Sequence, residues 1–379
     1  MRPIPFNRAA VTGREAEYVG RAIAEGPIHG DGPFTQACHA QLAAMTGAPK
    51  VLLTTSCTHA LEMSALLLGI GPGDEVIMPS FTFVSTVNAF VLRGARPVFV
   101  DIRPDTLNLD ETRLEAAITP RTRAIVVVHY AGVACEMAAI MAVAEAHGLP
   151  VVEDNAHGLF GTYRGRRLGS FGVLSTLSFH DTKNLSCGEG GALVINDASY
   201  ADRAEIIREK GTNRTRFYRG QVDKYTWCDI GSSYLPSDIL AAYLLAQLEA
   251  RDEIQFRRQA LWARYQSGLS EWASHHGIGL PTVPADCAHP AHLFYLVMPS
   301  LEARTRLLAF LRERQVLAVF HYLPLHLSDM GRRFGGHEGQ CPVTESIADR
   351  LVRLPLFYQL SDADQQRVID AVMAGTEAL

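Results

Sequence analysis

The first half of the chain alternates between short apolar runs and segments of helical spacing, and this alternation restricts the fold more than any other feature. The apolar runs predict buried strands, and the intervening segments repeat their apolar residues with a helical period. Because a helix follows each strand, successive strands are expected to lie mostly parallel in one sheet with helices on both faces. The expected strands are 51–53, 75–78, 97–100, 124–128 and 151–153, and the expected helices are 58–68, 86–92, 111–118 and 137–147.

The rest of the chain predicts a division into two domains. A chain of 379 residues is long enough for one large domain and a smaller one. We predict a large domain over 1–250, beginning with an extended arm at 1–13 and a helix at 14–25, and a small α/β domain over 251–379. Helices 239–248 and 256–272 are expected to join the two, and the small domain is expected to contain strands 293–298 and 316–320 and helices 302–313 and 363–374.

One lysine stands in a polar, glycine-rich turn between two apolar runs. The runs cover 173–179 and 192–195, and both are readable as strands that flank Lys183. A lysine that is partly removed from water loses its proton more easily and becomes a nucleophile. A lone lysine in such a turn would more often point to solvent, so the interpretation of Lys183 depends on its surroundings.

An acidic residue, Asp154, ends the strand predicted at 151–153. In an open α/β sheet, ligands bind where the strands end, so Asp154 and Lys183 are expected at the same edge. Asp154 alone is more often a helix cap or a turn residue. Together, a lysine that binds an aldehyde and a carboxylate that keeps a pyridine nitrogen protonated are what pyridoxal phosphate requires.

Two further strand ends carry residues suited to this cofactor. The junction Thr54-Thr-Ser-Cys-Thr58 precedes a predicted helix, whose N-terminal amides favour a phosphate. Such a cluster is more commonly a simple N-cap. The segment Pro79-Ser-Phe-Thr-Phe83 follows the next strand, and one of its two rings could stack on the pyridine. Two phenylalanines packed in the core are an equally good interpretation from the residues alone.

Composition excludes several classes of function. The net charge is −5 and no basic run is present, which argues against a nucleic-acid partner. No apolar stretch approaches the length of a membrane span, and the N-terminus lacks an apolar signal core. The seven cysteines form no CxxC pair, so a disulfide framework is not expected, and a reducing compartment, the cytoplasm, is predicted.

The chain is identified as a member of the DegT/DnrJ/EryC1/StrS family of sugar aminotransferases by motifs along nearly its whole length. Within the family it most resembles the dTDP-4-amino-4,6-dideoxygalactose transaminases of bacterial surface-polysaccharide synthesis. Cys57, for example, stands where most of the family has glycine, and that subfamily also has cysteine at this position. The matching stretches are 4–7, 55–62, 79–86, 153–154, 178–191, 208–214, 220–227, 231–237 and 321–326.

The resemblance implies a fold-type-I pyridoxal phosphate enzyme and a role for each matching residue. Lys183 is the catalytic residue, which anchors the cofactor and moves the proton of the amino donor. Asp154 is expected at the pyridine nitrogen, Phe83 on the ring, and His157 near the phenolic oxygen. The cofactor's phosphate is expected to be bound by Thr58, the amide of Cys57, Ser178 and, from a partner subunit, Ser233, where most members have asparagine. Substrate contacts are expected from Lys210, Tyr225, His321 and Tyr322, and no metal is expected.

The implied reaction is a two-stage amino transfer in a homodimer with shared active sites. Glutamate would give its amino group to C4 of dTDP-4-keto-6-deoxyglucose, and an axial amine would make the galacto product. Three alternatives stay open: a transaminase of another nucleotide-linked keto sugar, a pyridoxal phosphate sugar dehydratase, and a protein that senses a ligand without turning it over. The dehydratases carry histidine in place of the lysine, so Lys183 speaks against the second.

Overall fold

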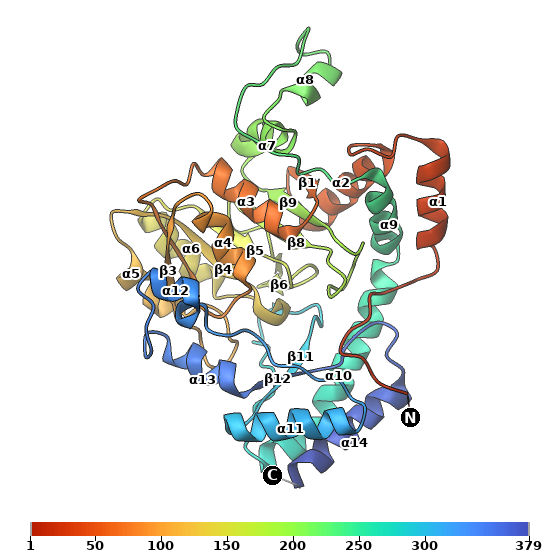
Figure 1. Ribbon diagram of the computed structural model, residues 1–379, viewed down its shortest axis with the longest axis vertical. Helices are drawn as coiled ribbons and strands as arrows, with labels where there is room; N and C mark the ends of the chain where they lie inside the picture. The colour runs from red at the N-terminus through yellow and green to blue at the C-terminus, as the bar shows by residue number, and fades with distance from the viewer. Residues whose placement is uncertain (1, 378–379) are drawn as a thin grey trace.

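A seven-stranded sheet forms the centre of the computed structural model, which describes residues 2–377 (Figure 1). Its strand order is β1-β9-β8-β5-β4-β2-β3. All neighbours from β8 to β3 are parallel, whereas β9 runs antiparallel to both β1 and β8. This mostly parallel sheet confirms the predicted fold class. The strands are β1 (Lys50–Thr54), β2 (Glu75–Pro79), β3 (Arg96–Val100), β4 (Thr122–Val128), β5 (Val151–Asp154), β8 (Leu174–Ser178) and β9 (Gly191–Ile195).

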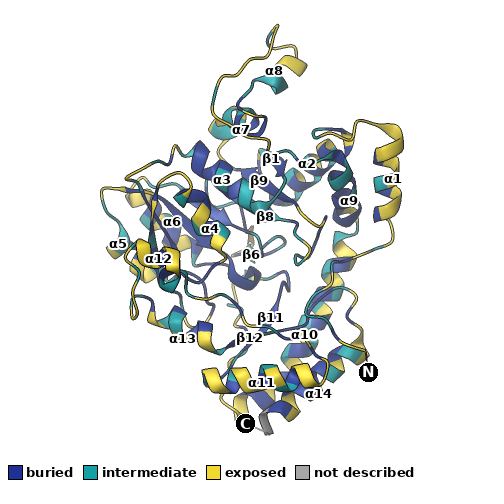
Figure 2. Ribbon diagram, in the orientation of Figure 1, coloured by how far each residue is buried: buried dark blue, intermediate teal, exposed yellow. Residues whose placement is uncertain are grey.

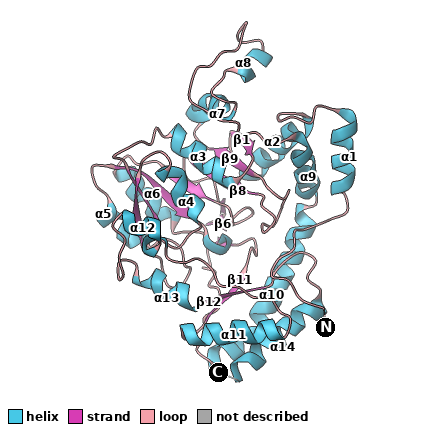
Figure 3. Ribbon diagram, viewed as in Figure 1, coloured by secondary structure: helices cyan, strands magenta, loops and turns pink. Residues whose placement is uncertain are grey.

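Helices cover both faces of this sheet and leave its strands buried (Figures 2 and 3). Successive residues of each strand point to opposite faces, so each strand contributes to two cores. Helices α3 (Cys57–Leu67), α4 (Val84–Val91) and α7 (Ala201–Arg208) pack on one face. On the other face, α1 (Glu15–Glu25), α2 (Pro33–Thr46) and α9 (Asp238–Glu249) cover the β1 side, and α5 (Leu114–Ala117) and α6 (Met137–Ala146) cover the β3 side.

Helix α2 is an element that the sequence prediction missed. It begins with Pro33 at its first turn and ends at Gly47, whose φ of 77° lies in the left-handed region. Proline at a helix start and glycine just beyond its end are ordinary boundary signals. The signal was therefore present in the sequence, although no helix was predicted there.

The C-terminal part is built on a two-stranded antiparallel sheet of β11 (Phe294–Val297) and β12 (Leu351–Leu354). Helices α10 (Arg251–His275), α11 (Leu301–Glu313) and α14 (Asp362–Glu377) pack around it. The division at 250/251 falls between α9 and α10 and stays a prediction. The side chain of Ile4, from the N-terminal arm, packs into this C-terminal core.

The strand predicted at 316–320 is wrong. This segment forms only two isolated bridges, Val316 with Ile4 and Val319 with Arg353, so its two ends pair with different partners. Helix α13 (Pro342–Arg350) and β12 were not predicted. The smaller elements are β6 (Thr162–Tyr163), β7 (Arg166–Arg167), β10 (Cys287–Ala288), α8 (Arg214–Tyr218) and α12 (Asp329–Arg333).

Two expectations from composition can be compared with the structure. No helix within residues 2–377 is long and apolar enough to cross a membrane. Each of the seven cysteines, all of which lie in the described part of the chain, carries a free thiol. The cytoplasmic location stays a prediction.

A close backbone contact at Gly191 sets the position of α3 relative to the sheet. Gly191 begins β9 and pairs with Thr54 of β1 and Ser178 of β8. A Cβ at this residue would lie 2.3 Å from the amide nitrogen of Cys57, where no side chain fits. Glycine therefore allows the N-terminus of α3 to lie directly against the turn that carries Lys183.

We expect Gly191→Ala to lower the free energy of unfolding by about 2 kcal/mol or more, because an atom forced into a packed site displaces its neighbours. Urea unfolding would measure the loss. Gly20→Ala is the matched control, since Gly20 lies in α1 with no atom within 4 Å of the added Cβ. A Gly191→Ala protein as stable as this control would show that the contact does not constrain α3.

Candidate active site

A cavity of about 470 Å³ opens where β4, β5 and β8 end, and both parts of the chain line it. The large part contributes the turn with Lys183, the end of β5 with Asp154, and the first turns of α3 and α4. The C-terminal part contributes His321, Tyr322 and the strand β12. Strand ends and helix starts thus meet in one place, as the sheet topology requires.

The amine of Lys183 lies in a poorly solvated part of this cavity. Burial lowers the pKa of Lys183 to about 8, and the positive charge of Arg353 acts in the same direction. The neighbouring Cys57 and Asp154 partly oppose this shift. An ordinary lysine has a pKa near 10.4. Lys183 therefore gives up its proton far more readily than a lysine in water.

Asp154 is buried at the end of β5, where it accepts two hydrogen bonds. One carboxylate oxygen accepts a hydrogen bond from the Thr86 hydroxyl at 2.7 Å, and the other accepts one from the Ala156 amide at 3.2 Å. Burial raises the pKa of Asp154, while these two bonds and the charge of Lys183 act to lower it. A cationic N–H placed against this carboxylate would stabilise its ionised form.

Two helices begin at the cavity. Ser56 caps α3 by accepting a hydrogen bond from the amide of His59 at 3.1 Å, so Cys57 and Thr58 form the first turn. First-turn amides have no partner within their helix and favour an anion. The Thr58 hydroxyl lies 2.8 Å from that of Ser85 in the first turn of α4, which brings hydroxyls from both helices together.

A stack of three buried histidine rings also lines the cavity. The ring of His157 lies 4.3 Å from that of His292 and 6.3 Å from that of His321, nearly parallel to both. Burial lowers the pKa of all three imidazoles well below the ordinary range, so they are neutral. The Nδ1 atom of His157 is buried and has no hydrogen-bond partner in the described chain. Such an atom normally indicates a missing ligand.

Comparison with known proteins identifies the family. The model of the DegT/DnrJ/EryC1/StrS aminotransferase family matches residues 10–373. The chain belongs to this aminotransferase family. The spore coat polysaccharide biosynthesis protein SpsC of Bacillus subtilis (strain 168) is 36% identical over 377 residues, which cover 97% of this chain and 96% of SpsC.

Solved structures agree with this membership. The aminotransferase TlmJ from Streptoalloteichus hindustanus is 33% identical, with a TM-score of 0.91 and 99% of each chain covered. Spr1654 from Streptococcus pneumoniae in its PLP-form is 28% identical, with a TM-score of 0.91 and the same coverage. We conclude that the cofactor of the present chain is pyridoxal phosphate.

The residues around the cavity fit that cofactor. Asp154 offers a buried carboxylate to a pyridinium N–H, and the unpartnered Nδ1 of His157 can meet a phenolic oxygen. The first turns of α3 and α4 offer amides and hydroxyls to a phosphate. Lys183 offers the amine for covalent attachment.

Most of the predicted site residues lie together in this aminotransferase. Phe83 is 57% exposed at the cavity mouth, whereas Phe81 is buried in the core. Lining the cavity are Cys57, Thr58, Phe83, Asp154, His157, Ser178, Lys183, His321 and Tyr322. Their individual roles stay predictions.

Three predicted residues lie outside the cavity of their own chain. Ser233 is exposed, Tyr225 is 54% exposed, and the amine of Lys210 pairs with Glu209 at 2.9 Å. Lys210, Tyr225 and Ser233 thus do not line the cavity of their own chain, and their roles stay predictions.

Among the lining residues that were not predicted are Ser85, His292 and Arg353. Ser85 carried a usable signal, because it lies in the first turn of a helix that follows a strand. His292 lies just before β11 and Arg353 lies in β12, both far along the sequence, and no local pattern linked them to Lys183.

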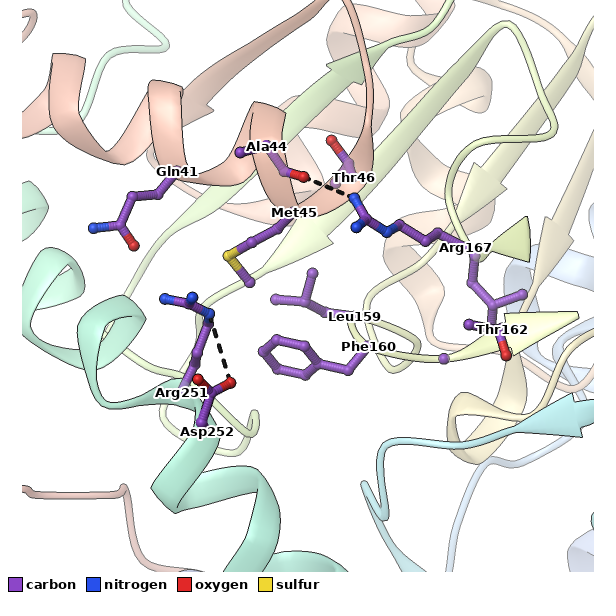
Figure 4. Close-up of a pocket in the computed structure, with 12 residues that line it drawn as sticks. Gln41, Ala44, Met45, Thr46, Leu159, Phe160, Thr162, Arg167, Arg251 and Asp252 are labelled. Atoms are coloured by element: carbon purple, nitrogen blue, oxygen red, sulfur yellow. Dashed lines mark hydrogen bonds and ion pairs between the residues drawn. The ribbon is translucent and has the colours of Figure 1, made fainter. Parts of the chain in front are cut away.

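A second and larger hollow, of about 650 Å³, shares no lining residue with the first (Figure 4). It lies between α2, α10 and the segment 159–168. Its cations are already paired: Arg167 donates to the carbonyl of Ala44 at 2.7 Å, and Arg251 lies 3.8 Å from Asp252. The Oε1 atom of Gln41 is buried there without a hydrogen-bond partner, but no lysine or histidine stands among the residues that line the hollow.

We expect Lys183 of the cofactor-free protein to react with acetic anhydride with a midpoint near pH 8, since only the deprotonated amine is nucleophilic and burial lowers its pKa to about 8. Mass spectrometry of the Lys183 peptide across pH would follow the reaction, with free N-acetyl-lysine as reference. Asp154→Asn should move the midpoint to lower pH, because the charge of Asp154 raises the pKa of Lys183. A midpoint near pH 10 would contradict this account of the lysine.

Proposed function

We propose that this pyridoxal phosphate aminotransferase transfers the amino group of glutamate to C4 of dTDP-4-keto-6-deoxy-D-glucose and forms dTDP-4-amino-4,6-dideoxy-D-galactose. The observation that carries the proposal of amino transfer is the presence of Lys183 and Asp154 in one buried cavity. The sugar is supported by the stretches 208–214, 220–227 and 321–326, which are rich in donors for a sugar nucleotide. The name of SpsC, a polysaccharide biosynthesis protein, agrees with a role in surface-polysaccharide synthesis.

The residues of the chain divide the work of this reaction. Bound pyridoxal phosphate supplies an electron sink for the carbon that loses its proton. Asp154 holds the pyridine N–H, and the first turns of α3 and α4 hold the phosphate. Lys183 would take a proton from the α-carbon of the donor in the first stage and would deliver one to C4 of the sugar in the second. A lowered pKa suits a group that must act as both base and acid near neutral pH.

We expect purified enzyme with glutamate and dTDP-4-keto-6-deoxyglucose to form the 4-amino sugar, and Lys183→Ala to form none. Proton NMR of the product gives the configuration, because an axial amine at C4 produces a small H3–H4 coupling. Lys50→Ala is a control, since Lys50 lies in β1 and pairs with Glu205 outside the cavity. A large coupling would exclude the galacto product, and normal turnover by Lys183→Ala would exclude the mechanism.

We further propose a homodimer whose active sites are built from two chains. Residues 212–231 project from the molecule beyond α7 (Figure 1). This projection carries Trp227, Tyr218 and Tyr225, which are 76%, 68% and 54% exposed. Exposed aromatic groups gathered on one segment are typical of an interaction surface. The neighbouring Ser233 is exposed and does not line its own cavity, which is compatible with a role in a partner's phosphate site.

The dimer proposal predicts that Trp227→Arg weakens association and lowers activity in parallel, because a charge would replace an apolar contact. Light scattering over a range of concentrations, with activity assayed on the same samples, measures both. Leu301→Arg is the control, since Leu301 is exposed on α11 at the opposite end of the molecule from α8 (Figure 1). A fully active monomer would refute the shared site.

A further inference from the structure

One cation in the active-site cavity lacks the partner that a buried charge requires. Arg353 of β12 lines the cavity, and no carboxylate within residues 2–377 forms an ion pair with it. Its Nε atom is buried without a hydrogen-bond partner, and its only side-chain bond is a long one, 3.5 Å, to the carbonyl of Phe320. Burial lowers the pKa of Arg353. A guanidinium left in this condition costs free energy that an anionic ligand would recover.

Backbone pairing on both sides fixes the strand position from which the side chain of Arg353 extends. Arg353 pairs with Tyr295 of β11 on one side, and its amide and carbonyl both bond to Val319 on the other, at 2.7 and 3.2 Å. Its neighbours Val352 and Leu354 are buried in the C-terminal core. The guanidinium also lies over the ring of Phe6, 4.6 Å from the ring centre. A side chain anchored by three segments is prepared to receive a ligand without rearrangement.

The guanidinium lies within electrostatic reach of the reacting amine. The charge of Arg353 lowers the pKa of Lys183 and of the three stacked histidines. Among the other charged groups that line the cavity, Asp154 would face the pyridine nitrogen and Lys183 would bind the cofactor, so neither is available to a substrate anion, and Glu189 is itself acidic. The cofactor's phosphate is accounted for by α3 and α4.

The chemistry of the two substrates decides which anion fits. In an amino acid, the α-carboxylate is attached to the carbon that loses its proton, so it must lie close to the amine of Lys183. In the keto sugar, the hexose ring separates the pyrophosphate at C1 from the reacting C4. An anion site near Lys183 therefore suits the donor and not the nucleotide. Arginine binds a carboxylate with two parallel hydrogen bonds, a geometry that lysine cannot provide.

We propose that Arg353 binds the α-carboxylate of the amino donor and so selects amino acids for the first stage of the reaction. This inference rests on the proposed transfer from an amino acid. It assigns a substrate-binding role to a strand of the C-terminal part, whereas the cofactor is held by the large part of the chain.

The test compares Arg353→Gln and Arg353→Lys with the wild-type holoenzyme. The probe is 2-methylglutamate, which has the α-carboxylate but no α-proton, and its binding is followed by the absorbance of the cofactor. Loss of a charged hydrogen-bonded partner is expected to weaken binding roughly 10- to 100-fold in Arg353→Gln. Arg353→Lys should be intermediate, because it keeps the charge without the bidentate geometry. The KM for the keto sugar should stay within about twofold of wild type.

Arg350→Gln is the matched control, since Arg350 is only partly buried at the end of α13 and does not line the cavity. Thermal melting of each variant shows whether it is folded. If Arg353→Gln unfolds, Arg353→Lys provides the test. Unchanged binding of 2-methylglutamate in the folded variants would overturn the proposal. A raised KM for the sugar nucleotide with unchanged donor binding would also overturn it, and would assign Arg353 to the pyrophosphate.

The donor itself is tested separately. If glutamate alone does not change the absorbance of the wild-type holoenzyme but another amino acid does, the proposed donor is wrong. Arg353 is then tested with the α-methyl analogue of the active amino acid. If only amines without a carboxylate react, the inference about Arg353 falls as well.

Discussion

Two adjacent carboxylates at the end of β5 set the geometry on which the rest of the site depends. Because side chains alternate along a strand, Glu153 and Asp154 point to opposite faces of the sheet. Glu153 is fully buried, and its oxygens accept hydrogen bonds from the ring of His129 and from the amides of Gly169, Phe171 and Gly172. These four bonds fix the end of β5 from behind. Asp154 is the next residue, so its backbone is fixed by the same bonds.

Glu153 and the polar groups around Lys183 differ in how completely their hydrogen bonds are satisfied. Glu153 has every partner that a buried charge needs, so it stabilises the fold and leaves nothing for a ligand. Around Lys183 the compensation is incomplete: the Nδ1 of His157 and the Nε of Arg353 are buried without partners. Native proteins seldom leave buried polar atoms unpaired. Both atoms belong to residues that line the cavity, where a cofactor and substrates could supply the missing partners.

Local patterns in the sequence predicted most of the sheet and the centre of the site. Strand and helix periods located β1 to β5 within a few residues. The expectation that Lys183 and Asp154 lie near each other required only that strand ends meet at one edge of the sheet. Non-local pairing was beyond such patterns. The antiparallel direction of β9 and the splitting of 316–320 between Ile4 and Arg353 depend on segments distant in the sequence. Arg353 was missed for the same reason, since its environment is made by three separate segments.

The placement of Arg353 also links donor binding to the strength of the catalytic base. Its positive charge is one of the causes that lower the pKa of Lys183. A carboxylate bound to Arg353 would neutralise that charge and so raise the proton affinity of the lysine amine. Lys183 would then be the stronger base once an amino acid occupies the cavity, which is when a proton must leave the α-carbon. In the second stage the keto sugar brings no carboxylate to this position, so the amine would keep its lower pKa there.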